Sequence, residues 1–588
     1  MKQSFNPLDL LLLHAPSVYD YREKSIFYGP ISDVIPSSTV FEMYPLGFLT
    51  IASYLQHQGM KVRIVNLALR MMNDRNFSVP NFLSRLHARA VGIDLQWLPH
   101  AHGALEIAKI VKEVHPKTPV IMGGLSSSYF HEELIRYPQV DYVIRGDSTE
   151  LPLCMLLSAI RDDRPLADIA NLTWKENGIT RVNPMTFLPS SLDYVDIRPD
   201  LMVQMVMRHR DLVSALPYRG WWRNPITAVF TVKGCRYECA TCGSSKTTCE
   251  HITKRSRPAF RTPESLAANA AAISRLTRGP IFLVGDLGQG GADYAQAVLD
   301  CLRQANIANE IVFEFFDIPP EGFLRQIDSA VRHWSMEFSP ESHEQAVRQA
   351  QEGEPSYNNE QFEKVLLEAL RLRCNRIDVF FMVGLPQQTY DSVLEDVAYC
   401  QHLFEISDRR LSCFLSPMGP FLDPGSRAFE EPEKFGYRLF ARNLEEHRQL
   451  LVQPTWERML NYETRWMTRA QLVDATYDAA EQLNALKLRY GRISKQRGSA
   501  VALHLREARE LRKRLAAAER QGKELPGGLE GEIVKYSQST VCDKTELFWP
   551  AHLVNFRIGE ILRIFGRFVR GNERLNEPYR SLTRPRET

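Results

Sequence analysis

Short apolar runs alternate with amphipathic stretches over the first part of the chain. Strand-like runs lie at residues 8–13, 61–65, 89–95, 119–122 and 140–144, and helical patterns lie at 46–57, 102–115 and 130–137. Short strands with helices between them predict a doubly wound parallel sheet. We therefore expect residues 1–160 to form one α/β domain, and such domains bind ligands at the carboxyl ends of their strands.

A second series of strand and helix patterns begins near residue 226. Six apolar runs lie at 229–232, 281–284, 311–315, 333–338, 377–383 and 411–416, with helical stretches between them. One helix has clear start signals, because Thr262 can cap it and Pro263 suits its first position. Six βα units predict a partial, open (β/α)6 barrel over residues 226–430, with its active site at the carboxyl ends of the strands.

The stretches beside the barrel have other patterns. Residues 161–225 have no sustained period and several prolines, so they predict a linker with a small hairpin at 171–182. Residues 431–588 are expected to form a helical region. Within it, 485–520 and 552–569 combine apolar positions at helical spacing with many Lys and Arg. These segments either contact an anionic membrane surface or pack on the barrel with solvated basic side chains.

Composition and charge narrow the class of protein. The chain has 588 residues, with 44% apolar and 24% charged residues, and 72 basic against 70 acidic residues give a net charge of +2. These values are typical of a globular protein with several domains, and we find no nucleic-acid-binding module. We expect no signal peptide, and no apolar run reaches the ~18 residues of a membrane span. The expected location is the cytoplasm, with membrane association as the alternative that the basic segments allow.

Three of the ten cysteines stand together after the first barrel strand. Cys235, Cys239 and Cys242 have the spacing C-x3-C-x2-C, so one loop presents three thiols. Thiolates suit an iron–sulfur cluster or zinc, and three protein ligands leave a metal position open. A structural zinc site normally has four protein ligands, and Cys249 and His251 lie at no familiar zinc spacing. An iron–sulfur cluster is therefore favoured.

The cysteine trio and its position after a strand resemble the radical SAM superfamily. Members of that family hold a 4Fe-4S cluster on such a loop, and S-adenosylmethionine chelates the iron that the protein leaves free. The resemblance implies Cys235, Cys239 and Cys242 as cluster ligands. Family members usually carry an aromatic residue just before the third cysteine, over the adenine, whereas this chain has Thr241.

The N-terminal domain looks like the cobalamin-binding domain that precedes many radical SAM barrels. The similarity rests on residues 45–55, 122–124 and 141–147, in the family's order. The D-x-H-x-x-G signature, which supplies an axial histidine to cobalt in other cobalamin domains, is absent here. Cobalamin is therefore a further cofactor that the resemblance implies, and none of His14, His100 and His102 is expected to bind the metal.

The same resemblance implies cofactor contacts at other strand ends. They are Asp286, Glu337, Ser339, Arg348 and Gly384 for S-adenosylmethionine, and Gly123 and Gly124 for cobalamin. Each has an ordinary alternative, such as a helix cap, a solvated helix residue or a tight turn. Asp317, Asp423 and Arg427 are weaker candidates for substrate contacts.

The reaction that the resemblance implies is reductive cleavage of S-adenosylmethionine, followed by hydrogen abstraction from an unactivated C–H bond of a small-molecule or lipid substrate. An external electron donor such as flavodoxin or ferredoxin would supply the electron. If cobalamin is bound, methyl transfer is the expected outcome. The alternatives are a cobalamin-independent radical SAM enzyme that closes rings or couples carbon atoms, and a non-catalytic cobalamin- or metal-binding sensor. The sequence does not identify the substrate.

Overall fold

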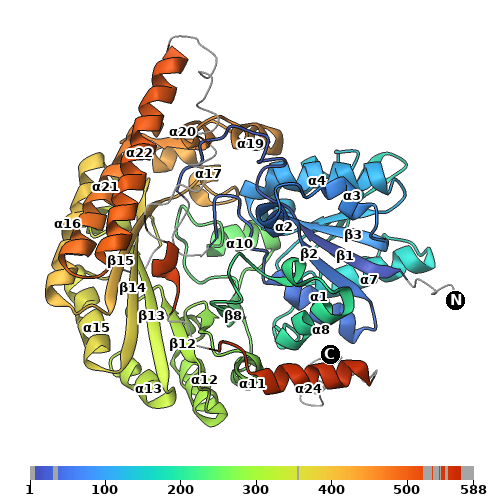
Figure 1. Cartoon of the computed structure of the whole chain (residues 1–588), viewed down its shortest axis with the longest axis horizontal. Helices are drawn as coiled ribbons and strands as arrows, with labels where there is room; N and C mark the ends of the chain where they lie inside the picture. Colours follow the sequence, from blue (N-terminus) through green and yellow to red (C-terminus); the bar gives the residue numbers. More distant parts are fainter. Residues whose placement is uncertain are drawn as a thin grey trace.

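The computed structural model describes residues 7–30, 37–353, 356–520, 533, 542, 544–549 and 554–570. These residues form two parallel sheets, each with helices packed against it (Figure 1). In Figure 1 the N-terminal sheet is blue and lies on the right, and the barrel is green to yellow and lies on the left. Helix α10 (Lys246–Thr253) lies between them.

The N-terminal sheet has the predicted doubly wound architecture. Its parallel strands run in the order β2-β1-β3-β4-β5: β1 (Leu8–His14), β2 (Val62–Asn66), β3 (Ala88–Asp94), β4 (Val120–Gly123) and β5 (Tyr142–Ile144). Helices α1 (Gly47–His57) and α7 (Glu150–Asp162) pack on one face, and α4 (Ala101–Val114) packs on the other. The strand order reverses between β1 and β3, and ligands bind at such a reversal in sheets of this type.

The predicted hairpin at 171–182 is present, but it belongs to this sheet rather than to a separate linker. Strand β6 (Leu172–Glu176) pairs antiparallel with β5, and β7 (Ile179–Val182) pairs with β6. Leu172 is fully buried in the same core as Ile144. The expected loop at 161–225 also contains α8 (Pro199–His209), because its proline stands at the first helical turn, where it starts a helix instead of breaking one.

The open barrel is also confirmed. Six parallel strands run in sequence across one sheet: β8 (Thr227–Phe230), β11 (Ile281–Val284), β12 (Glu310–Phe315), β13 (His333–Glu341), β14 (Cys374–Val383) and β15 (Leu411–Pro417). Trp334, Met336 and Phe338 of β13 pack outward against helices in the main core. Because side chains alternate along a strand, Ser335 and Glu337 face the inside of the barrel.

The helical region covers the β15 side of the barrel. Helix α21 (Arg469–Arg489) packs against β15 and α16 (Tyr390–Ile406), and α22 (Lys495–Arg520) packs on α21. The apolar face of α22 is buried, from Val501 to Leu515. The basic segment at 485–520 therefore packs on protein. Ala518, which we expected on the same apolar face, lies outside the side chains that the structure describes.

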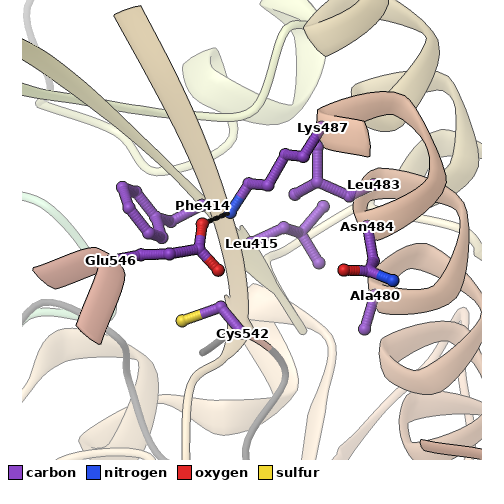
Figure 2. A pocket seen from close by; sticks show the side chains of 8 residues that line it. All are labelled: Phe414, Leu415, Ala480, Leu483, Asn484, Lys487, Cys542 and Glu546. Carbon is purple, nitrogen blue, oxygen red and sulfur yellow. Dashed lines mark hydrogen bonds and ion pairs between the residues drawn. The ribbon is translucent and has the colours of Figure 1, made fainter. Parts of the chain in front are cut away.

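Residues 544–549 cover the barrel at the amino ends of its strands, and we term them the barrel floor. Arg376, near the start of β14, donates to the carbonyls of Glu546 (2.5 Å) and Phe548 (3.1 Å), and its guanidinium lies 4.2 Å from the ring centre of Trp549. Lys487 of α21 forms a 2.8 Å ion pair with Glu546, and both side chains are buried (Figure 2). The floor thus joins the helical region to the amino ends of the barrel strands.

Helix α24 (Ile558–Val569) packs on α8 and α11 (Pro263–Leu276). Ile564 is buried there, whereas four apolar side chains on another face are exposed: Ile558, Leu562, Phe565 and Val569. Among the described residues, no helix is both long and apolar enough to cross a bilayer.

Candidate cofactor site

The cysteine loop leaves the carboxyl end of β8 and turns at Gly234, which has a φ of +88°. The backbone N–H of Tyr237 donates to the Cys235 sulfur at 3.4 Å, and the N–H of Ser244 donates to the Cys242 sulfur at 3.3 Å. Hydrogen bonds of this kind to thiolates tune iron–sulfur clusters. The loop therefore presents its sulfur atoms in a polar backbone setting that suits thiolate ligands.

Gln351, beyond the fourth barrel strand, holds the loop from outside. Its side-chain oxygen accepts from the Thr241 N–H (3.3 Å) and from the Thr241 hydroxyl (3.1 Å), and its carbonyl accepts from Ala240. Its amide nitrogen donates to Glu341 at 2.9 Å. Thr241, where the family usually has an aromatic residue, is thus used to fix the loop to Gln351.

Asp423 and Arg427, two of the weaker candidates for substrate contacts, also touch this loop. Asp423 accepts from the Gly243 N–H at 3.1 Å, and a Cβ at Gly243 would lie only 2.6 Å from the same carboxylate oxygen. Burial raises the pKa of Asp423 to about 6. Arg427 donates to the carbonyls of Glu238 and Glu352. Both side chains therefore position the cysteine loop.

Within the described ranges, no three His, Cys, Asp or Glu side chains are grouped as they would be around one metal ion. A 4Fe-4S cluster binds each thiolate through a different iron atom, so its sulfur ligands stand farther apart than ligands of a single ion. Burial raises the pKa of Cys235, and metal binding would have to offset this preference for the thiol. Three cysteines on one loop, with N–H donors at two sulfurs, fit the cluster.

Protein groups already occupy two of the predicted S-adenosylmethionine contacts. Asp286 accepts from the N–H groups of Gly288 (2.7 Å) and Phe316 (3.1 Å), so it caps a short helix and ties β11 to β12. Arg348 is 4% exposed, and its guanidinium donates to the carbonyls of Ser342 and Tyr357. The ordinary alternatives for these residues are thus present in the fold.

The remaining barrel residues of that set lie at different depths. Ser339 is half-buried on the inner face near the end of β13, whereas Glu337 lies deeper, four residues before the strand ends at Glu341. Gly384 follows β14 with a φ of +106°, and a Cβ there would lie 2.5 Å from the Tyr462 hydroxyl. The close contact that requires a glycine at this position is therefore made with the Tyr462 side chain.

At the carboxyl edge of the N-terminal sheet, His14 is fully engaged. One ring nitrogen bonds the Asp94 carboxylate (3.0 Å) and the other bonds the Phe41 carbonyl (2.9 Å). His100 lies beside it, with ring centres 4.8 Å apart, and burial lowers its pKa to about 4. The Tyr19 N–H donates to His102 at 3.3 Å. Of these three histidines, His14 thus has both ring nitrogens bonded to protein.

The glycines after β4 differ in what surrounds them. A Cβ at Gly124 would lie 2.6 Å from the backbone of Gln96, so this glycine allows two strand-end loops to touch. At Gly123 the nearest atom would be a carbonyl 3.7 Å away, which is ordinary contact. Among the described residues, the buried Ser127 hydroxyl and one ring nitrogen of His100 have no hydrogen-bond partner. These unpaired polar atoms at a strand-end edge fit a bound polar ligand such as cobalamin.

The carboxyl edges of the two sheets face each other. Asp147, after β5, binds Arg255 through both carboxylate oxygens (2.5 and 2.9 Å), and its carbonyl accepts from Lys233 of the cysteine loop's entry strand. The Tyr129 hydroxyl donates to Glu430 at 2.7 Å. Ligands bound at the two edges would therefore lie toward one another.

Sequence reasoning missed Gln351 and Glu341, which join the fourth strand to the cysteine loop. Glu341 has a φ of +64°, in the left-handed region that non-glycine residues seldom adopt. The only signal for it was the polar run Glu341-Ser342 directly after an apolar strand. Gln351 lies in the turn after α14 (Gln345–Gln349), where nothing local marks it.

Comparison with known proteins agrees with this geometry. Residues 33–152 match the family model of the B12 binding domain. An uncharacterised methyltransferase of Pyrococcus horikoshii is 29% identical over 203 residues, which are 34% of this chain and 40% of that protein. The chain therefore matches less than half the length of this relative.

Two solved structures are similar over most of the chain. TsrM of Kitasatospora setae is a radical S-adenosylmethionine methyltransferase solved with its tryptophan substrate and a SAM analogue. The alignment covers 81% of this chain and 88% of TsrM, at 16% sequence identity and a TM-score of 0.56. OxsB, a cobalamin-dependent S-adenosylmethionine radical enzyme solved with aqua-cobalamin and S-adenosylmethionine, covers 98% and 83%, at 13% identity and a TM-score of 0.52. This chain has the fold of cobalamin-dependent radical SAM enzymes. The predicted fold class and the family resemblance are thereby confirmed.

Proposed function

We propose that this protein is a cobalamin-dependent radical SAM methyltransferase that acts on a small molecule. The observation that carries the proposal is the placement of the cysteine loop at the carboxyl edge of the barrel, facing the same edge of a B12-binding domain. Cofactors bound at the two edges would meet in one space. A sensor has no need for such an arrangement, because it does not pass a group from one cofactor to a substrate.

The chain's own residues would bind and position the cofactors. Cys235, Cys239 and Cys242 would hold the 4Fe-4S cluster, and Gln351 and Asp423 fix the loop that carries them. When bound, the cluster would supply the electron that cleaves S-adenosylmethionine, and cobalamin would carry the methyl group. The barrel floor closes the opposite end of the barrel and so limits the access of water from below.

Asp286, Ser339, Arg348 and Gly384 remain proposed contacts for S-adenosylmethionine, whereas Glu337 lies deeper in the barrel, four residues before the end of β13. Gly123 and Gly124 remain proposed contacts for cobalamin. An external electron donor, flavodoxin or ferredoxin, is part of the same proposal. So is contact with a membrane surface, for which the support is the exposed apolar stripe of α24 beside its arginines. Co-sedimentation with anionic liposomes at physiological salt tests this contact, and binding that Phe565→Ser does not weaken would contradict it.

The direct test is anaerobic reconstitution of the full chain with iron, sulfide and hydroxocobalamin, followed by reduction with S-adenosylmethionine present. We expect 5′-deoxyadenosine, and transfer of an isotope-labelled methyl group to a compound in cell extract. Deoxyadenosine without retained corrin would favour the cobalamin-independent alternative. Bound cofactors without any cleavage under several reductants would favour the sensor.

A further inference from the structure

Three carboxylates on adjacent strands form one layer inside the barrel. Glu314 of β12 lies directly opposite Glu337 of β13, and Glu337 lies opposite Asp378 of β14. The neighbouring residues in these strands, such as Phe313 and Val379, pack outward in the main core. Because side chains alternate along a strand, the three carboxylates point into the barrel. We term them the acidic layer.

The acidic layer contains more carboxyl groups than the nearby cations pair with. Asp378 pairs with Arg376 at 2.8 Å, and that guanidinium also binds the barrel floor. Glu314 accepts from the Gly285 N–H at 2.7 Å. Glu337 is 7% exposed, and in the described part of the chain its carboxylate has no hydrogen-bond donor. Carboxylates directly opposite one another destabilise a sheet when they are ionised, and burying a carboxyl group without a partner also costs folding free energy. Among the described residues, no hydrogen bond or ion pair to Glu337 offsets this cost.

The surroundings raise the pKa of Glu337 and Glu314, the two carboxyl groups of the layer that have no ion pair among the described residues. Burial raises the pKa of Glu337 well above its usual range, and the nearby Asp378 and Glu314 add to the effect. Burial also raises the pKa of Glu314 to about 7. A cation that entered this layer would favour the ionised forms and would take the place of the protons.

The depth of the layer separates it from the proposed cofactor edge. Glu337 lies four residues before the end of β13, which corresponds to about 13 Å along the strand. Cofactors and reactive groups gather at the carboxyl ends of such strands. Beneath the layer, the barrel floor already occupies Arg376. The acidic layer therefore lies between the cofactor edge and the floor, where part of a substrate could be held.

We propose that the acidic layer, with Glu337 at its centre, binds the protonated amine of the substrate. The inference rests on the proposed function, which places the reacting part of the substrate near the cysteine loop above. A metal ion is a poorer fit, because among the described side chains no group of His, Cys, Asp and Glu is arranged to hold one. Ser339 lies on the same inner face and offers a hydroxyl beside the cation.

Binding of paired amine and alcohol probes to the full, cluster-loaded chain tests the proposal. The pairs are butylamine with 1-butanol and phenethylamine with 2-phenylethanol, measured by calorimetry and by the shift in thermal midpoint. We expect at least one amine to bind and its alcohol not to bind. Glu337→Gln should weaken that amine by about 30-fold, because one partner of a buried charge pair is lost. Glu314→Gln is the second variant and should also lower the affinity for that amine.

Glu310→Gln is the matched control. Glu310 lies on the same inner face of β12, two layers lower, and is already bonded to Ser335. This variant should leave amine binding unchanged. The proposal fails if no amine binds better than its alcohol, or if Glu337→Gln reduces the affinity for S-adenosylmethionine and leaves amine binding intact. Probe binding needs no turnover, so absent cleavage of S-adenosylmethionine with amine binding intact would overturn only the proposed function.

Discussion

The two strand-end edges that face each other are built in different ways. At the barrel edge, side chains from distant parts of the chain hold the cysteine loop, as Gln351 and Asp423 show. At the N-terminal edge, His14 is bonded to its own domain and the Ser127 hydroxyl has no partner among the described residues. One edge thus presents fixed donor atoms for a metal, and the other presents a surface shaped by backbone. The difference predicts that single substitutions act strongly at the first edge and weakly at the second.

The largest effect is expected at the cluster ligands. Changing Cys235, Cys239 or Cys242 to Ala should abolish the brown 4Fe-4S absorbance and all cleavage of S-adenosylmethionine, because a cluster with two protein thiolates is poorly held. The control is Cys249→Ala, because the Cys249 thiol donates to the Ser244 carbonyl at 3.3 Å and is not in the predicted ligand set. A cluster that survives in Cys239→Ala, or disappears in Cys249→Ala, would contradict the assignment.

A smaller effect is expected from the residue that holds the loop. Gln351→Ala removes the side-chain bonds to Thr241 and Glu341 and leaves the ligands in place. Loss of such outer support should speed the decay of the cluster in air by about tenfold or more, measured from its absorbance. The matched control is Gln349→Ala, because Gln349 is exposed and ends α14 (Gln345–Gln349) two residues before Gln351. Equal decay in both variants would remove Gln351 from the site.

At the N-terminal edge, one substitution should change little. We expect the full chain to retain hydroxocobalamin through desalting, and the electron paramagnetic resonance spectrum of its cob(II)alamin form should lack nitrogen coupling from a protein histidine. His14→Gln should give the same spectrum, because both ring nitrogens of His14 are already bonded to protein. A spectrum that shows nitrogen coupling in the wild type and loses it in this variant would make His14 a ligand.

The smallest expected effect is a difference in how the two sheets respond to pH. Burial lowers the pKa of His100 from 6.5 to about 4, so between these values the unfolded chain binds a proton that the folded chain does not, and stability falls as the pH falls. Burial raises the pKa of Glu314 from 4.5 to about 7, so there the folded chain binds the extra proton and stability rises as the pH falls. Amide exchange at pH 7 and pH 5, corrected for intrinsic rates, should show protection decreasing in β3 and α4 relative to β12. Parallel changes in both regions would contradict this difference.

The strands of both sheets were predictable because each buries a continuous apolar run. The prediction was less accurate at the ends: β13 was expected to stop at residue 338 but runs to Glu341, which pairs with Phe381 across a register shift. A local pattern cannot show such pairing. The hairpin was recognised from its turn, but its place beside β5 depends on a core that forms only in three dimensions.

The cysteine trio was predictable because its members are close in sequence and their spacing has a chemical meaning. Its supports were not predictable. Gln351 contacts Thr241 from 110 residues away, and Asp423 contacts Gly243 from 180 residues away. Arg348 and Asp286 were recognised as polar groups near strand ends, but the sequence could not show that backbone groups already bind them.

The barrel floor also affects the order in which the protein is assembled. Its residues are synthesised long after the last barrel strand, yet Arg376 donates to the Glu546 carbonyl and Lys487 pairs with the Glu546 carboxylate. Until residues 544–549 are made, Arg376 can pair with Asp378 but lacks the floor carbonyls, and Lys487 lacks the Glu546 carboxylate. Synthesis of residues 544–549 therefore sets a time point, because from then on the amino ends of the barrel strands can be covered by the floor.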